Sequence, residues 1–337
     1  GRQIALRPPF VNNRLAPSGF SPAALKIAEK LPKTTDPCGA ITYGAPADDD
    51  EWQGVAKIDY QMSERHSLFA RYLHTDFSAK AAWPRTSNIL TTSVRGRPKV
   101  STAKSLTFGD TLIFGANMVN SLRVALNPTH VDIDLAPFLD APSVGSKVYT
   151  YIPGQIVLDV TNGFSVGTGG SVKQYVNQDY YQVSDDFTMV RGSHEIAIGG
   201  TYSYWSSDQL INGRSVGNFT FNGTRTGLPL ADFLSGQLFR LEHGAPGVLP
   251  LDQTYIGLYA QDAWRVHERV TVNAGMRWEP FFGQNVKNGA ISNFSLDNFR
   301  TGVRSSAFTN APAGLMFPGD PGFSPGNSGP NPQWWNL

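Results

Sequence analysis

The sequence predicts an all-β protein in which about eight long antiparallel strands form part of a membrane-spanning barrel. Three observations lead to this prediction. Apolar and polar residues alternate in eight separate stretches of about 8–12 positions. Very short and very long connections join these stretches in turn. No run of about 18 apolar residues is present to form a spanning helix, whereas a spanning strand needs only about 9–11 residues.

The alternating stretches pair into four hairpins with tight, polar connections such as "SERH", "GAN" and "RGSH". The expected hairpins cover residues 53–62 with 67–76, 102–114 with 118–127, 180–190 with 195–205, and 254–266 with 269–280. The connections between hairpins are far longer than the 12–15 residues that compact soluble domains usually tolerate. Short turns at one end and long loops at the other are typical of outer-membrane barrels.

The alternation gives each strand one apolar and one polar face. We expect the apolar residues to face lipid: Ile58, Tyr60, Ile196, Ile198, Tyr202, Val270, Val272, Met276 and Trp278. We expect the polar residues to line the lumen, where they contact a plug or water: Lys57, Asp59, Arg71, Arg123, Asn273, Arg277 and Glu279. Asp185 and Asp262 fall in the apolar phase. We expect Asp185 to sit at a bulge or to contact a neighbouring strand, because a charge facing lipid costs about 2 kcal/mol or more.

Strand length fits a bilayer. About 10–12 residues at roughly 3.3 Å each give about 33–40 Å, and a tilt of roughly 45° reduces the span to about 23–28 Å, close to an apolar band of about 25 Å. The strands of a soluble β-sandwich are usually about 5–6 residues long. Aromatic residues near the strand ends suit an interfacial belt; they are Tyr180, Tyr181, Tyr202, Tyr204, Trp205, Tyr255, Trp264 and Trp278.

Composition narrows the class of protein. Only 16% of the 337 residues are charged, below the soluble average of about 25%. Lys and Arg (28) nearly balance Asp and Glu (27), so nothing in the bulk charge favours nucleic acid. Cys38, the single cysteine, can form no internal disulfide. We expect a fragment of a longer protein, with a loop region over 1–52, barrel hairpins over 53–280 and an extracellular loop over 281–337.

Several segments resemble TonB-dependent outer-membrane receptors. They are "YQVSDDFTMVRGSHEIAIGGTYSY" and "LYAQDAWRVHERVTVNAGMRWEP". "GLPLADFLSG" is similar to a short helical segment in the long loops of the Oar-like branch, whose members carry a carboxypeptidase-regulatory-like domain; "NNRLAPSGFSPAALKIAEKLPKT" and "FPGDPGFSP" resemble loops of the same branch. The resemblance implies a plugged barrel of about 22 strands in the bacterial outer membrane. The plug, the regulatory domain and the contact with TonB would belong to the parent protein. Eight consecutive strands of so wide a barrel should form an open, curved sheet.

No motif for catalysis, a metal or a cofactor is convincing, so we expect no enzyme activity. Ser165 and Ser324 lie in Gly-x-Ser-x-Gly matches, but a nucleophile elbow needs a strand before the serine and a helix after it, and Ser165 lies in a Gly-rich stretch without a following helix. His66, His194 and His267 fall in the short turns, where we expect solvated side chains. Ligand capture would fall to aromatic residues of the long loops: Trp83, Tyr149, Tyr151, Phe219, Phe221, Phe281 and Phe282.

The favoured function is therefore uptake of a large or scarce solute through an outer-membrane receptor, whose partners are membrane lipid, its own plug, TonB and the solute. Two alternatives stay open. One is a non-transport outer-membrane barrel or adhesin. The other is a soluble, secreted β-sandwich that binds carbohydrate. The sandwich requires protein to cover the apolar face that begins at Val270.

Overall fold

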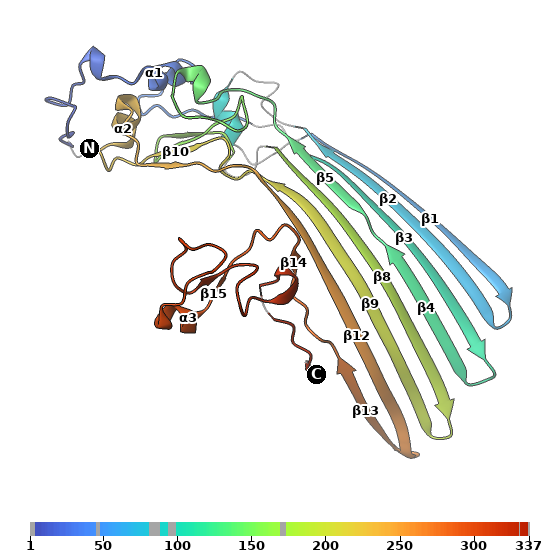
Figure 1. Ribbon diagram of the computed structural model, residues 1–337. Helices are drawn as coiled ribbons and strands as arrows, with labels where there is room; N and C mark the ends of the chain where they lie inside the picture. Colours follow the sequence, from blue (N-terminus) through green and yellow to red (C-terminus); the bar gives the residue numbers. More distant parts are fainter. Residues whose placement is uncertain are drawn as a thin grey trace.

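The computed structural model describes residues 4–44, 48–80, 88–93, 99–168, 173–329 and 331–335. Figure 1 shows one long, curved sheet with a folded layer of loops over one end. The strands along the sheet follow the order β1-β2-β3-β4-β8-β9-β12-β13, and every neighbouring pair is antiparallel. Among the described residues no pairing joins β1 to β13, so the sheet is open. The prediction of an all-β, open, curved antiparallel sheet is confirmed.

The eight strands of the main path are long enough to cross a bilayer, whereas β5 and β14 are short strands that pair beside them. Their bounds are β1 (Asp49–Ser63), β2 (His66–Ala79), β3 (Lys99–Phe114), β4 (Met118–Leu126), β5 (Thr129–Asp134), β8 (Lys173–Arg191), β9 (His194–Ile211), β12 (Gly247–His267), β13 (Val270–Trp278) and β14 (Asn285–Val286). Each hairpin turn consists of only two or three residues, and Gly115 and Gly192 provide a positive φ in two of these turns. No described helix has the length and apolar character needed to cross a membrane.

Most strands extend further toward the long loops than alternation predicts. β8 begins seven residues before the predicted start at 180, and β12 begins seven before 254. In the β8 extension both faces carry polar residues, so the apolar signal that marks a strand in lipid is lost. The β12 extension carries apolar residues on both faces and contains Pro250, so it does not alternate either. A second extension follows Pro128, which has no N–H for the ladder. β5 continues β4 beyond this proline and pairs with β3 and β8 in the register that β4 already has.

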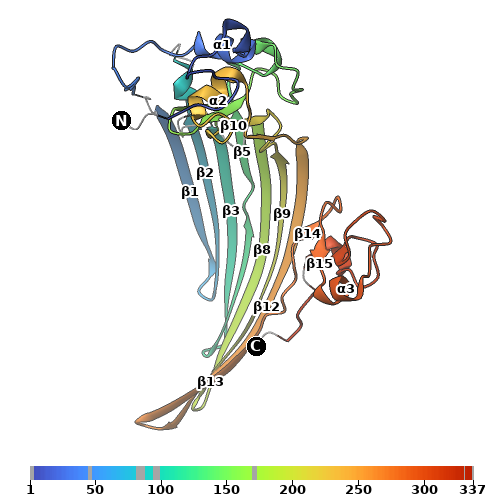
Figure 2. The same cartoon turned by 90° about the vertical axis from the view of Figure 1, so that its left-hand side faces the viewer.

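The layer over the long-loop end, here called the loop cap, consists of residues 4–44, 88–93, 135–168 and 212–246 (Figures 1 and 2). Its elements are η1 (Pro17–Gly19), α1 (Pro22–Ala28), η3 (Ile89–Ser93), η4 (Pro142–Val144), β6 (Val157–Val160), β7 (Phe164–Val166), β10 (Asn218–Phe221), α2 (Pro229–Ser235) and β11 (Arg240–Glu242). Four of its strands form a small mixed sheet in the order β11-β10-β6-β7. The short helix expected in "GLPLADFLSG" is α2, which is confirmed.

The main hydrophobic core of the described chain lies in the loop cap rather than in the long sheet. Its buried members come from all four cap segments: Ala24, Ile27, Leu90, Leu139, Ala141, Val144, Ile156, Leu158, Val160, Val166, Phe221 and Phe233. Over most of its length the described sheet carries no second layer, although the C-terminal segment contacts β12, where Asn285 donates to Asp252. The long loops, in contrast, bring enough apolar residues together to exclude water.

The C-terminal segment lies beside the β12–β13 edge of the sheet (Figure 2). It contains β14, β15 (Asn293–Phe294), α3 (Leu296–Thr301), β16 (Leu315–Met316) and η5 (Pro325–Asn327). The chain then returns along this edge, where Phe281 and Gln333 exchange backbone hydrogen bonds of 2.8 and 2.9 Å. The segment that we expected to be a loop thus contains β14, which pairs with β12, and forms an isolated bridge just beyond β13.

Candidate functional site

The strand register places all nine predicted lipid-facing residues on one face of the sheet. Ile58, for example, lies in the same cross-strand row as Tyr202, and Ile198 lies in the row of Met276. Several of these side chains are widely exposed, with Ile58 at 70% and Met276 at 66%. Soluble monomers rarely expose a continuous apolar face of this extent. No second sheet covers this face within the described chain, which argues against the sandwich alternative.

Three acidic residues lie on this apolar face, and each has a polar partner on an adjacent strand. Asp185 accepts a hydrogen bond of 2.7 Å from the Asn120 amide on β4, without a bulge in β8. Asp110 lies 3.0 Å from Nε2 of His66. Asp262 lies 2.7 Å from Nδ1 of His194. The expected contact between Asp185 and a neighbouring strand is confirmed, whereas His66 and His194 are not solvated turn residues.

The apolar face ends in polar residues toward the loop cap. Across the strands this boundary is formed by His74, Asp76, Lys104, Asp179, Ser206 and Asp252. Tyr72, Tyr181 and Tyr204 lie just inside it, as an aromatic girdle would. The predicted belt was wrong for Tyr180, Trp205 and Tyr255, because the register puts them on the opposite, polar face.

The polar face contains all seven predicted lumen residues. The register places six of them there, and Glu279, one residue beyond β13, contacts that face. Lys57 and Asp59 form an ion pair of 2.6 Å. The structure places these residues on one face, but whether that face lines a lumen stays a prediction.

A hydrogen-bonded network on the polar face joins β12 to β13. Arg277 Nε donates to Glu279 at 2.5 Å, and its Nη2 donates to the Tyr255 hydroxyl at 2.8 Å. Tyr255 in turn donates to Glu279. Nearby, Tyr259 donates to Asp186 of β8 at 2.7 Å, across β9. Sequence reasoning identified Arg277 and Glu279 but missed both tyrosines and Asp186.

Glycines on the polar face make room for these tyrosine rings. A Cβ on Gly199 would lie 2.4 Å from the Tyr259 ring and 2.6 Å from Asp186 Oδ1. A Cβ on Gly257 would lie 2.6 Å from the Tyr255 hydroxyl. The rings therefore lie close against the backbone, where a larger residue would displace them. Alternation of apolar residues carries no signal for this arrangement, because it involves only glycines and polar groups.

The second candidate site is an apolar cavity in the loop cap. β6 and β10 pair in parallel, so Leu158 and Phe219 are neighbours on the same face, as are Val160 and Phe221. Helix α1 lies across this face with Ala24 and Ile27, three residues apart, pointing inward. The apolar pattern of these short elements therefore converges on one core.

Helix α2 positions the aromatic side of this core. The Phe233 ring packs edge to face against Phe164 and Phe221, with ring centroids 5.3 and 5.5 Å apart. The helix ends at Gly236, whose φ of 71° suits glycine and whose Cα approaches Ser21 so closely that a Cβ would lie 3.0 Å from the serine Cβ. The Ser21 N–H donates to the Leu234 carbonyl at 2.8 Å, which joins the two helices.

A buried carboxylate fixes the turn that precedes α2. Asp232 is fully buried. Its side chain accepts hydrogen bonds from the backbone N–H groups of Gly223, Arg225 and Thr226 and from the Thr226 hydroxyl, at 2.7 to 3.3 Å. Four donors satisfy the charge without a cation. The same turn holds the N-terminal segment of the cap, because the Arg7 N–H donates to the Thr226 carbonyl at 2.8 Å.

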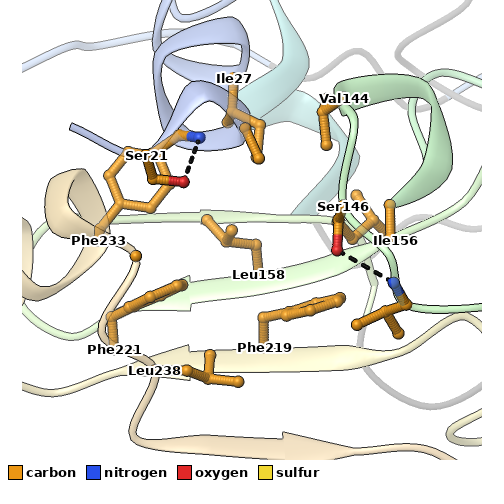
Figure 3. A pocket seen from close by; sticks show the side chains of 15 residues that line it. Ser21, Ile27, Val144, Ser146, Ile156, Leu158, Phe219, Phe221, Phe233 and Leu238 are labelled. Atoms are coloured by element: carbon orange, nitrogen blue, oxygen red, sulfur yellow. Dashed lines mark hydrogen bonds between the residues drawn. The ribbon is translucent and has the colours of Figure 1, made fainter. Parts of the chain in front are cut away.

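The cavity between these elements has a volume of about 230 Å³ (Figure 3). Its apolar lining comes from α1, the η4 segment, β6, β10 and α2. Ser21 and Ser146 are its only polar side chains among the described lining residues, and none of those residues is charged. Of the predicted loop aromatics, Phe219 and Phe221 line it. Tyr149 and Tyr151 instead form an exposed aromatic pair with Tyr151 stacked on His243, and Trp83 lies outside the described residues.

Comparison with known proteins identifies the family. The family model for the outer membrane beta barrel domain matches residues 1–337, so the chain belongs to this family and is a component of the bacterial outer membrane. Among solved structures it is similar to the outer membrane transporter YddB from Escherichia coli, with a TM-score of 0.41 and 15% identity over 72% of this chain. The match covers 29% of that transporter. A search of curated proteins finds no match.

Proposed function

We propose that this chain forms part of the wall and the extracellular loops of a TonB-dependent outer-membrane receptor of the Oar-like branch, which imports a large or scarce solute. The width of the wall carries this proposal. Eight strands can close into a small barrel on their own. Here eight long strands form an open sheet in which, among the described residues, β1 and β13 do not pair, so the barrel needs further strands. A barrel much wider than eight strands needs a plug unless it is an open pore.

The polar face supports the same function. The Arg277–Glu279–Tyr255 network and the Tyr259–Asp186 contact give this face fixed donors and acceptors. A plug domain in the parent protein would bind such groups, and TonB would act on that plug. The loop cap, with its own core and cavity, would capture the solute outside the cell.

Growth experiments test this proposal in the native host. Strains that lack the gene for the full-length protein, or the gene for TonB, are compared on media in which single nutrients are scarce. We expect both strains to fail on the same nutrient, and the intact receptor to restore growth only where TonB is present. Restored growth without TonB would overturn the proposal. Normal growth together with lost surface attachment would favour the adhesin.

We also propose that the chain has no hydrolytic activity. The Ser165 hydroxyl lies in β7 and donates to Asp159 at 2.7 Å. The Gly-rich stretch around Ser165 thus contains a short strand, β7. A hydrolase assay in which Ser165→Ala abolishes turnover would contradict this proposal.

A further inference from the structure

We propose that the loop-cap cavity binds one apolar group of a ligand, an aromatic ring or a short branched acyl chain, that carries an oxygen acceptor. This inference rests on the proposed function, because a receptor cap is where a solute would be captured. It concerns only the chemistry of the cavity (Figure 3).

The size of the cavity sets the size of the group. A dry cavity of about 150 Å³ lined by Leu, Ile and Phe can hold benzene. At about 230 Å³, this cavity has room for a ring with one substituent. The rings of Phe219, Phe221 and Phe233 line it together with Ile27 and Leu158. Such a lining favours an apolar, polarizable group.

Two serines give the cavity its polar specificity. Ser21 Oγ accepts a hydrogen bond from the Ala24 N–H at 3.4 Å, and Ser146 Oγ accepts one from the Val148 N–H at 3.3 Å. A hydroxyl has one proton to donate besides its acceptor capacity. Within the described chain neither hydroxyl proton has a protein acceptor. The cavity therefore offers donors, which a carbonyl or carboxylate oxygen of the ligand would complete.

The charge beside the cavity favours an anionic acceptor over a neutral one. Lys26 Nζ lies 3.8 Å from where a Cβ of Gly145 would be, and Gly145 lies between the lining residues Val144 and Ser146. No acidic side chain lines the cavity in the described part of the chain. Lys26 itself is exposed and does not line the cavity. A carboxylate at the Ser146 end would lie near this cation, and the hydrogen bonds that it accepts from the serines would be charge-assisted and therefore stronger than neutral ones.

The cavity is not a sign of poor packing throughout the cap. Directly beside it, Phe233 packs edge to face against two other rings. The gap lies where three separate parts of the chain meet: the α1 segment, the segment that contains η4 and β6, and the segment that contains β10 and α2. A space of this kind loses packing contacts when it is empty, so a ligand that fills it is favoured.

Binding can be measured by ¹⁹F NMR on the full-length receptor in detergent micelles, with 4-fluorobenzoate, methyl 4-fluorobenzoate and fluorobenzene as probes. We expect saturable binding, tightest for the benzoate. Ala24→Leu places its added atoms in the cavity, so all three probes should bind at least tenfold more weakly while the melting temperature stays equal or rises. Leu25→Met, on the exposed side of the same helix, is the matched control and should leave binding unchanged.

Ser146→Ala keeps the inference testable if Ala24→Leu fails to fold. It should weaken the two oxygen-bearing probes about threefold to tenfold and leave fluorobenzene unaffected. Absence of saturable binding, or equal binding to wild type and Ala24→Leu, would overturn the inference. The growth experiments do not depend on these probes, so a failure of the cavity proposal is distinguishable from a failure of the receptor proposal.

Discussion

Asp262 Oδ2 lies 2.7 Å from Nδ1 of His194 on the apolar face of the sheet. His194 begins the strand that follows a short turn, and Asp262 lies diagonally opposite on the next strand. His66 and Asp110 repeat this diagonal placement on β2 and β3, with Nε2 of the histidine 3.0 Å from the carboxylate. Each histidine thus gives a polar partner to a carboxylate that would otherwise face hydrocarbon alone.

We predict that His194→Ala destabilises the folded barrel by about 1–3 kcal/mol, the cost of leaving a buried polar partner unsatisfied. One carboxylate oxygen of Asp262 is already without a partner, so the histidine is its remaining side-chain contact. Urea unfolding of the full-length protein in lipid vesicles measures the loss.

The double variant of His194→Ala with Asp262→Ala serves as the control. It should be more stable than His194→Ala alone, because removing both partners removes the unsatisfied charge. Additive losses in this double-mutant cycle would show that the two side chains do not interact.

The orientation of the two faces can be tested on a single strand. Ile198 on the apolar face of β9 and Thr201 on its polar face are three residues apart. We predict that Ile198→Arg costs about 2–4 kcal/mol in vesicles, the cost of an arginine in mid-bilayer, and that Thr201→Arg costs far less. Vesicle unfolding compares the two variants. A larger loss in Thr201→Arg would reverse the assignment of the faces.

The sheet could be predicted from the sequence because a strand in lipid has to alternate. Where this condition holds, at Ile58 or Met276, the predicted face agrees with the register. Beyond the apolar band it fails, and the strand extensions of β8 and β12 went unpredicted. The belt prediction failed for Tyr255 because an aromatic ring can lie on either face of the sheet. Only the register of β12 against its neighbour shows on which face the ring lies.

The cavity could not be predicted, because its residues come from distant segments. Ala24, Leu158 and Phe233 each belong to elements of four to seven residues, too short for a clear periodicity. Their convergence depends on turns such as the one fixed by Asp232. The only sequence signal for this turn is the carboxylate of Asp232 within an otherwise apolar helix. Such a carboxylate indicates a buried charge that accepts hydrogen bonds, but it does not identify the donors.

We predict that Asp232→Ala opens the turn around residues 223–227 and loosens the loop cap while the long sheet stays folded. Three backbone N–H groups and the Thr226 hydroxyl would lose their acceptor, and a hydrogen bond to a charged group contributes about 1.5–3 kcal/mol. Limited proteolysis should cut within 212–246 in this variant. Asp232→Asn, which keeps one acceptor oxygen, should be intermediate. Equal resistance in Asp232→Ala and wild type would show that the carboxylate does not hold the turn.

The C-terminal segment should be sensitive to acid through Asp320. The Ser305 side chain, the Phe317 and Ala307 N–H groups and the Ser306 side chain hydrogen-bond to this carboxylate, which holds its pKa well below the usual range. Because the pKa of Asp320 is lower in the folded than in the unfolded state, its carboxylate stabilises the fold fully when the pH is above the unfolded-state pKa of about 3.9. This stabilisation is lost as the pH falls from that value toward the folded-state pKa.

Amide exchange over residues 305–323, corrected for the intrinsic effect of pH, should therefore stay constant from pH 7 to about 4 and quicken below that. Asp320→Asn should exchange faster throughout and lose the acid dependence, since an amide cannot provide two acceptor oxygens to these donors. Asp297→Asn, an exposed acid in the same segment, should behave like wild type. If Asp320→Asn kept the same acid transition, another group would be responsible for it.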